Sequence, residues 1–263
     1  MTQLLSALTR AVSARLSDCE LSFLDRQPID LVGARTEHHA YEEVLRRLGL
    51  QVIELPPLDE LPDAVFVEDT AVVVDEVAVL ARPGAASRAP EVASVGHALS
   101  RWRPVVQLGG SGTLDGGDVL RADGQFYVGL SRRTSADGAS ALGEALAPFG
   151  YGVTPVAVTG CLHLKTAASY LGEGRMLVHR PWFDASRLSG FELFDVPADE
   201  AWGANVLVLG TDAVLPAGFP GTRALLERLG LRTHEVAFTE LLKAEAGVTC
   251  ESIVFQSVVS RES

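Results

Sequence analysis

The chain repeats one local pattern along most of its length. Short apolar runs come in pairs around tight turns, at Asp75-Glu76, Asp123-Gly124, Gly172 to Gly174 and Gly210 to Asp212. An amphipathic segment and one more short apolar run follow most of these pairs. The pairs recur about every 40 to 50 residues, a period typical of modules arranged around an axis. The repeat therefore predicts a ring of similar units.

The elements that build this repeat can be placed by residue number. Asp123-Gly124 is the strongest hairpin signal, and Ser135 and Thr36 are expected to cap helices. The region before Asp30 shows no clear amphipathic helix, and its second half is expected to be a loop. The predicted strand pairs are 65–74 with 77–82, 114–130, 163–171 with 175–179, 204–209 with 213–216, and 248–259; the helices are 36–48, 90–102, 135–150 and 222–229; the single strands are 50–55, 105–108, 153–158 and 233–236.

We predict an α/β fold with helices outside a ring of hairpins, built as a single domain over residues 1–263. A doubly wound sheet would also alternate helices and strands, but tight hairpins do not join its parallel strands. The length of 263 residues suffices for a sizeable core.

Composition narrows the function classes. The net charge of −12 opposes binding to nucleic acid and favours a cationic small molecule. No apolar run is long enough to cross a membrane, and the N-terminus lacks the features of a secretion signal. Three widely spaced cysteines, Cys19, Cys161 and Cys250, predict free thiols rather than a disulfide framework. We expect a cytoplasmic protein, and the sequence does not decide whether it forms a homodimer.

The stretch from Leu61 to Arg82 places acids at the mouth of a strand. Asp63, Glu68 and Asp69 flank Phe66, and no lysine or arginine lies between the first and the last of them. A buried carboxylate without a partner is costly. Acids on a solvated loop are the ordinary alternative, but three around one phenylalanine favour a site that holds a cation.

Other unusual polar residues also fall at predicted hairpin mouths: Asp115, Asp118, His163 and Cys250. Singly, a cysteine among apolar residues is more often a small core residue, and a histidine between two leucines is more often buried for packing. At equivalent places in the repeat, they are better explained as one constellation that converges on a channel.

Seven ordered motifs resemble one known family over nearly the whole chain. They are FVED (66–69), RPGAASR (82–88), LDGGDV (114–119), GLSRRT (129–134), LHLKT (162–166), LPAGFPGTR (215–223) and GVTC (247–250). The family is dimethylarginine dimethylaminohydrolase, of the guanidine-modifying superfamily with the pentein fold. The resemblance implies five ββαβ modules around a pseudo-fivefold axis.

The resemblance also implies a reaction and a set of residues. The reaction is hydrolysis of an Nω-methylated arginine to citrulline and an alkylamine through a covalent thiouronium, without a cofactor. Cys250 is the implied nucleophile, His163 the implied acid and base, and Asp115 the residue that orients the imidazole. The implied substrate contacts are Leu21, Asp63, Glu68, Asp69, Arg88, Arg133 and Ala244, and Phe66 is expected to pack against the alkyl chain.

The chain departs from the family pattern beside the nucleophile. Glu245-Ala246 stands where Asp-Gly is usual, and Glu251 follows Cys250 where smaller or apolar residues are common. These departures concern substrate preference more than reaction class.

Three alternatives stay open. An arginine deiminase or amidinotransferase uses the same residue types, although deiminases usually carry an added helical domain. A non-catalytic pentein that binds a partner is the second. The third is zinc held by Cys161, His163, Cys250 and Asp115, whose spacing lacks a usual structural pattern; inhibitory zinc captured by Cys250 and His163 is the more plausible form.

Overall fold

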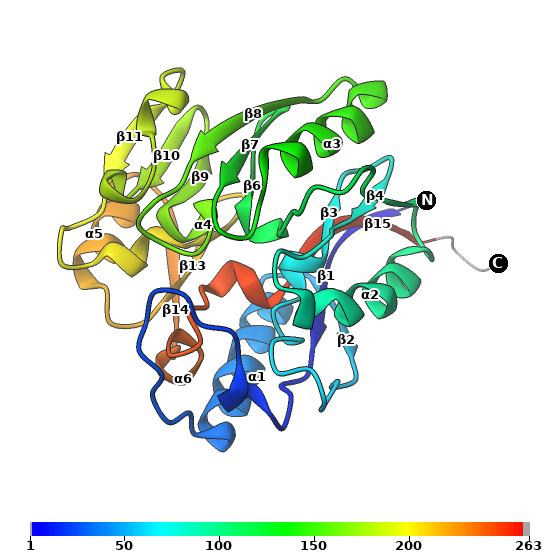
Figure 1. Ribbon diagram of the computed structural model, residues 1–263. Helices are drawn as coiled ribbons and strands as arrows, with labels where there is room; N and C mark the ends of the chain where they lie inside the picture. The colour runs from blue at the N-terminus through cyan, green and yellow to red at the C-terminus, as the bar shows by residue number, and fades with distance from the viewer. Residues whose placement is uncertain (1, 260–263) are drawn as a thin grey trace.

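The computed structural model describes residues 2–259 and consists of five three-stranded sheets arranged in a ring (Figure 1). In every sheet the first strand pairs antiparallel with the second, and the second pairs parallel with the third. This arrangement confirms the expected ring of five α/β modules. The sheets are β15 (Ile253–Val259), β1 (Thr2–Arg10) and β2 (Gln51–Leu55); β3 (Ala71–Val73), β4 (Ala78–Leu80) and β5 (Val105–Gln107); β6 (Val119–Ala122), β7 (Gln125–Leu130) and β8 (Gly152–Ala157); β9 (Ala168–Gly172), β10 (Arg175–Val178) and β11 (Glu192–Asp195); and β12 (Leu207–Leu209), β13 (Asp212–Pro216) and β14 (Arg232–Val236).

The helices lie on the outside of the ring because each crosses from the second strand of its sheet to the third. Two parallel neighbouring strands need such a crossover. The crossover helices are α1 (Leu31–Arg47), α2 (Val92–Leu99), α3 (Ala136–Leu146) and α5 (Pro220–Arg228) (Figure 1). The β9–β10–β11 sheet is crossed instead by two 3-10 turns, η6 (Arg180–Trp182) and η7 (Ala185–Leu188). Without a helix signal there, the sequence did not predict β11.

The two ends of the chain close the ring together. β1 pairs antiparallel with β15, with Ala7 opposite Val254 and Leu8 opposite Ile253. The sequence did not predict β1, and its prediction of a hairpin within 248–259 was wrong, because the partner of β15 comes from the N-terminus. The pairing ties the strand after Cys250 to the first residues of the chain.

Helix boundaries show where local signals were sufficient. Ser135 caps α3 as predicted, with its hydroxyl accepting from the N–H of Gly138. Thr36 does not cap α1: Asp30 does, by accepting from the N–H of Val32, while the Thr36 hydroxyl bonds back to the carbonyl of Val32 inside the helix. The helix is therefore longer at its N-terminus than predicted.

A short helical turn precedes the first strand of each sheet. These turns are η2 (Val67–Thr70), η4 (Gly116–Asp118), α4 (Leu164–Ala167), η8 (Ala201–Ala204) and η9 (Val248–Glu251). The sequence predicted strand at most of these positions, which was wrong. Turns of neighbouring modules contact one another around the ring, η2 with η4 and η9, and α4 with η4 and η8. They carry or adjoin most of the candidate site residues.

Apolar clusters fill the space between and beneath the modules. One of them combines α1, the N-terminal region and the segment 236–250, and others lie under neighbouring sheets. Within the described residues, no helix has both the length and the apolar character that crossing a bilayer requires.

Candidate active site

One small pocket brings the predicted residues together. Its volume is about 10 Å³, room for one water at most. A methylated arginine is far larger, so the site is closed and must open to admit it. Its walls are Glu20, Asp63, Phe66, Asp69, Arg88, Arg133, Leu162, His163, Ala244, Glu245, Ala246 and Cys250.

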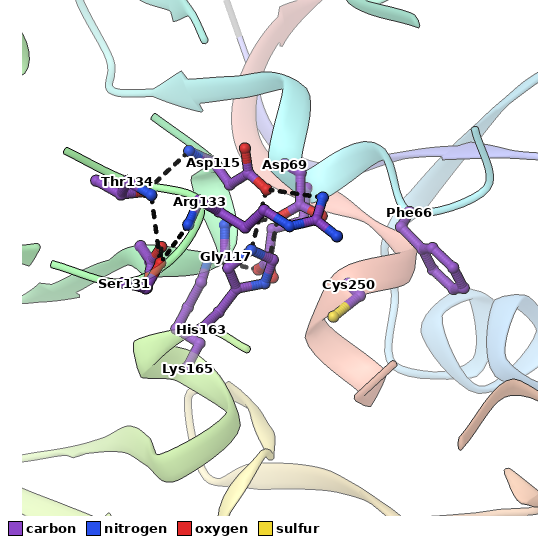
Figure 2. A network of polar contacts seen from close by, with 12 residues as sticks. Phe66, Asp69, Asp115, Gly117, Ser131, Arg133, Thr134, His163, Lys165 and Cys250 are labelled. Carbon is purple, nitrogen blue, oxygen red and sulfur yellow. Dashed lines mark hydrogen bonds and ion pairs between the residues drawn. The ribbon is translucent and has the colours of Figure 1, made fainter. Parts of the chain in front are cut away.

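Cys250 lies in η9 at one side of the pocket, and its sulfur points toward the side where His163 and Asp69 lie (Figure 2). The N–H of Gly247 approaches this sulfur at 3.4 Å. Gly247 can take no side chain, because a Cβ there would come within 2.3 Å of Asn205. Burial, together with the charges of Glu68 and Asp69, raises the pKa of the Cys250 thiol. At neutral pH, Cys250 is therefore a thiol in the free protein.

His163 is the residue directly before α4, and its side chain faces two carboxylates. Its Nε2 lies 3.1 Å from Asp115 Oδ2, and its Nδ1 lies 3.7 Å from Asp69 Oδ1 (Figure 2). Burial alone would lower the pKa of His163, but Asp69, Asp115 and Asp118 outweigh it and raise this pKa to about 9. Gly117 must be glycine, since a Cβ would lie 2.5 Å from the imidazole Nδ1. The imidazole is therefore protonated at neutral pH and can act as an acid.

Asp69 is held in its ionised form. Its Oδ2 accepts from Arg88 at 2.5 Å and its Oδ1 accepts from the N–H of Gly117 at 2.8 Å. Burial opposes ionisation, but His163 and Arg88 lower the pKa of Asp69 to about 2. Arg88 also bonds Glu91 and the carbonyls of Asp63 and Phe66. Most donors of Arg88 are thus engaged in fixing the pocket wall.

Asp115 and Asp118 hold the ring of His163 and the backbone next to it in position. Asp115 accepts from the N–H of Gly84 at 2.8 Å, and Arg133 lies 4.0 Å from its carboxylate. Asp118 accepts from the N–H of Leu164, the residue after His163, at 2.9 Å. Burial raises the pKa of Asp118 to about 6, with His163 acting against it. These bonds fix both the ring and the backbone that carries it.

Not every predicted residue lines this pocket. Glu68 faces a separate cavity of about 320 Å³, where it pairs with Lys165 at 2.6 Å. It also accepts from the hydroxyl of Thr249 at 2.9 Å and so contacts the turn that carries Cys250. Leu21 packs against the neighbouring apolar cluster, beside the pocket wall. Asp115 lies behind His163.

The metal-ligand geometry differs from the predicted zinc set. Among the described residues, the group close enough to share an ion is Asp69, Asp115 and His163, and neither Cys161 nor Cys250 belongs to it. Cys161 instead donates to the carbonyl of His163. An ion at this group would have to displace the proton of an imidazole whose pKa is about 9.

Sequence reasoning missed several residues of the site. Glu20 and Leu162 line the pocket without having been singled out, and Lys165 pairs with Glu68. Glu245 was noted as a departure from the family but was given no role. Glu245 gave a usable signal: an acid beside a predicted nucleophile, in a segment that is otherwise apolar.

Two curated relatives are similar to this chain over most of its length. No family model matches the chain. A Streptomyces coelicolor protein named N(G),N(G)-dimethylarginine dimethylaminohydrolase is 39% identical over 94% of this chain and 95% of its own length. A Pseudomonas aeruginosa protein of the same name is 33% identical over 86% of this chain and 90% of its own.

A solved structure is similar over almost its full length. It is a cysteine-to-serine mutant of the Pseudomonas aeruginosa enzyme in complex with citrulline, with a TM-score of 0.91 and 30% identity, and the match covers 96% of this chain and 100% of that one. Identity of this size over so much of both chains shows common descent. The chain belongs to the dimethylarginine dimethylaminohydrolase family, with its pentein fold.

Proposed function

We propose that this protein hydrolyses Nω-methylated L-arginine, asymmetric dimethylarginine or monomethylarginine, to L-citrulline and dimethylamine or methylamine. The observation that carries the proposal is that Cys250, His163 and Asp69 line one closed pocket. The names of the two relatives and the citrulline held by the similar structure support it. It is a hydrolase acting on an amidine C–N bond.

The first half of the reaction uses the charges of the empty site. A bound guanidinium lowers the pKa of the Cys250 thiol, which loses its proton to solvent. The thiolate attacks the central guanidinium carbon and forms a C–S bond. His163, already protonated, gives its proton to the alkylamine nitrogen as the C–N bond breaks. The amine leaves, and a cationic thiouronium on Cys250 and a neutral imidazole remain.

The second half returns the protons. Water attacks the thiouronium carbon while the imidazole of His163 accepts one of its protons. The second water proton, held on the hydroxyl of the adduct, passes to the sulfur as the C–S bond breaks, so Cys250 leaves as the thiol and citrulline is released. Asp115, at 3.1 Å from Nε2, stabilises the imidazolium that re-forms. The enzyme ends with the protonation states from which it began.

The remaining residues are proposed as substrate contacts. Asp69 is ionised beside the nucleophile, which supports a role in binding the guanidinium. Glu68 contributes to that region through Thr249. The other proposed contacts are Asp63 for the α-amino group, Leu21 and Ala244 as backbone or lid contacts, Arg88 and Arg133 for the carboxylate, and Phe66 for the alkyl chain.

The deciding assay incubates the purified protein with arginine, monomethylarginine and asymmetric dimethylarginine, without added metal, and measures citrulline. We expect turnover of the methylated substrates and none in Cys250→Ser. Asp69→Asn is expected to lose saturation at accessible substrate concentrations. Arginine as the best substrate would indicate a deiminase instead, and no turnover of any of the three would favour a binding role.

The cellular setting is part of the same proposal. We infer that residues 1–263 act as one catalytic domain in the cytoplasm, which the three unpaired cysteines support. Zinc is expected to inhibit by capturing Cys250 and His163, and a chelator should reverse that inhibition. Sedimentation of the purified chain decides whether it is a homodimer.

A further inference from the structure

Glu245 is a buried acid that binds backbone rather than a cation. Its Oε1 accepts from the N–H groups of Ser22, Phe23 and Leu24, at 2.9, 2.5 and 2.6 Å. Its side chain is buried, and its Oε2 has no hydrogen-bond partner among the described residues. No ion pair joins it to a lysine, arginine or histidine of residues 2–259. Within the described residues, its hydrogen bonds therefore come from backbone amides alone.

The backbone of Glu245 is also in a costly conformation. Its φ is +58°, a left-handed value that non-glycine residues seldom adopt. Such strain persists where the surrounding structure holds it in place. Ala244 and Ala246, on either side of it, line the same pocket.

The segment that Glu245 binds has few other attachments. Residues 20–29, here called the cover segment, make no backbone-to-backbone hydrogen bond to another element within the described chain. Side chains hold it instead. Asp63 accepts from the N–H of Glu20 at 3.2 Å, and Lys243 donates to the carbonyl of Pro28 at 3.1 Å. Glu245 supplies three bonds at the middle of the segment, more than any other side chain.

The cover segment borders the pocket through Glu20. Glu20 and Glu245 both lie in the pocket wall, and the remaining volume is about 10 Å³. Part of this wall must move before a substrate the size of arginine can reach Cys250. The cover segment is the part held by side chains rather than by a sheet, and local opening occurs where such contacts are few.

We propose that Glu245 is the latch that holds the cover segment closed over the pocket, and so positions this segment against bound substrate. Loss of the latch shifts the free protein toward the open form, and binding must then overcome the closure. KM rises, while the chemical step at Cys250 changes less. The effect on KM rests on the proposed function, whereas the latch itself does not.

The test measures opening directly in the full chain by amide hydrogen exchange. In Glu245→Ala, the amides of residues 22–24 are expected to exchange on the order of ten- to a hundredfold faster, the loss of bonds to a charged acceptor. Glu245→Gln keeps an acceptor oxygen without the charge. The amides of residues 22–24 should therefore exchange faster in this variant than in the native protein and more slowly than in Glu245→Ala. Alkylation of Cys250 by iodoacetamide, followed on its own peptide, should accelerate in the same order.

Glu200→Ala is the matched control. Glu200 also accepts backbone N–H bonds, from Gly221 and Thr222 at the start of α5, but it does not line the pocket. It should lower the melting temperature without changing exchange at residues 22–24.

Native exchange at residues 22–24 in a folded Glu245→Ala would overturn the latch, as would unchanged alkylation of Cys250. If Glu245→Ala does not fold, Glu245→Gln decides in the same way: faster exchange supports the latch and native exchange overturns it. These readouts need no turnover, so they stand apart from the proposed reaction. With turnover established, a raised KM and a nearly native kcat complete the support.

Discussion

Two buried histidines of this protein each lie beside a carboxylate, but one lines the pocket and the other does not. His163 lies 3.1 Å from Asp115, and His38 lies 2.8 Å from Glu251. Burial opposes protonation of both, yet nearby carboxylates raise the pKa of His163 to about 9 and that of His38 to about 10. His163 lines the pocket, whereas His38 lies on α1 and is buried against the turn that carries Cys250. Residue type and pKa therefore do not separate the histidine proposed as acid and base from a structural one; access to the pocket does.

The cluster around His38 anchors the turn that carries Cys250. Glu251 follows Cys250 in the chain, and Glu42 lies 3.4 Å from the other nitrogen of His38. Tyr41, on the same helix, bonds the hydroxyl of Ser252 at 2.7 Å. The acid that departs from the family pattern at position 251 therefore has a partner, and it connects the turn that carries Cys250 to α1.

The largest expected effect follows from replacing His163, the histidine that lines the pocket. His163→Ala should lower kcat by about 10²- to 10⁴-fold, because it removes the proton donor for the leaving amine. The measurement is steady-state citrulline formation, with thermal unfolding as the control for folding. Turnover close to native would remove His163 from the mechanism.

At the second histidine, Glu251→Ala removes the partner of His38 and should lower the free energy of unfolding. Removing one partner of a buried ion pair costs about 3–5 kcal/mol, and because Glu42 still lies 3.4 Å from His38, we expect a loss at the lower end of that range. Urea unfolding measures the free energy. A double variant with His38→Leu should be less destabilised than the sum of the two single variants. Additive losses would mean that the two side chains are not energetically coupled.

The pH dependence of stability sharpens the comparison, since both histidines bind protons more tightly when folded. Their contribution is complete below the unfolded pKa of about 6.5 and is lost as pH rises through 9 to 10. Each such proton changes the free energy of unfolding by about 1.4 kcal/mol per pH unit. We expect stability to fall between pH 7 and 9, and to fall less steeply in His38→Gln. A native slope in this variant would contradict the raised pKa of His38.

The smallest expected effect concerns the thiol. Lys165 acts against the carboxylates that raise the pKa of Cys250, so Lys165→Met should raise that pKa further. The rate of Cys250 alkylation, measured against pH, should shift toward higher pH by less than about one unit. A shift in the opposite direction would show that Glu68 loses its charge together with its partner.

Local signals predicted much of the ring. Ser135 and the Asp123-Gly124 turn act through their immediate neighbours, and Asp123 indeed has a positive φ of 52°. The five-module fold followed from the spacing of such signals and from the family motifs. The helical turns at the mouths of the sheets did not follow, because apolar residues before a strand look the same whether they extend it or precede it.

Long-range pairings were beyond the sequence. The partner of His38 lies 213 positions away, and the bonds from Ser22 to Glu245 span 223. No periodicity links such residues, so Glu251 and Glu245 stood out as unexpected acids without an explanation. The strand β1 was missed because β15, with which it pairs, comes from the far end of the chain.

Amino-acid order alone settled which residues are available for the chemistry, namely a thiol, an imidazole and acids at matching points of a repeat. The folded arrangement decided which of them meet. His163 and not His38 lines the pocket with Cys250. Glu68 lines the neighbouring cavity, and Glu245 holds the cover segment. The reason is physical. Turns and caps depend on neighbours in sequence, whereas burial, pKa and access depend on groups that only the closed ring brings together.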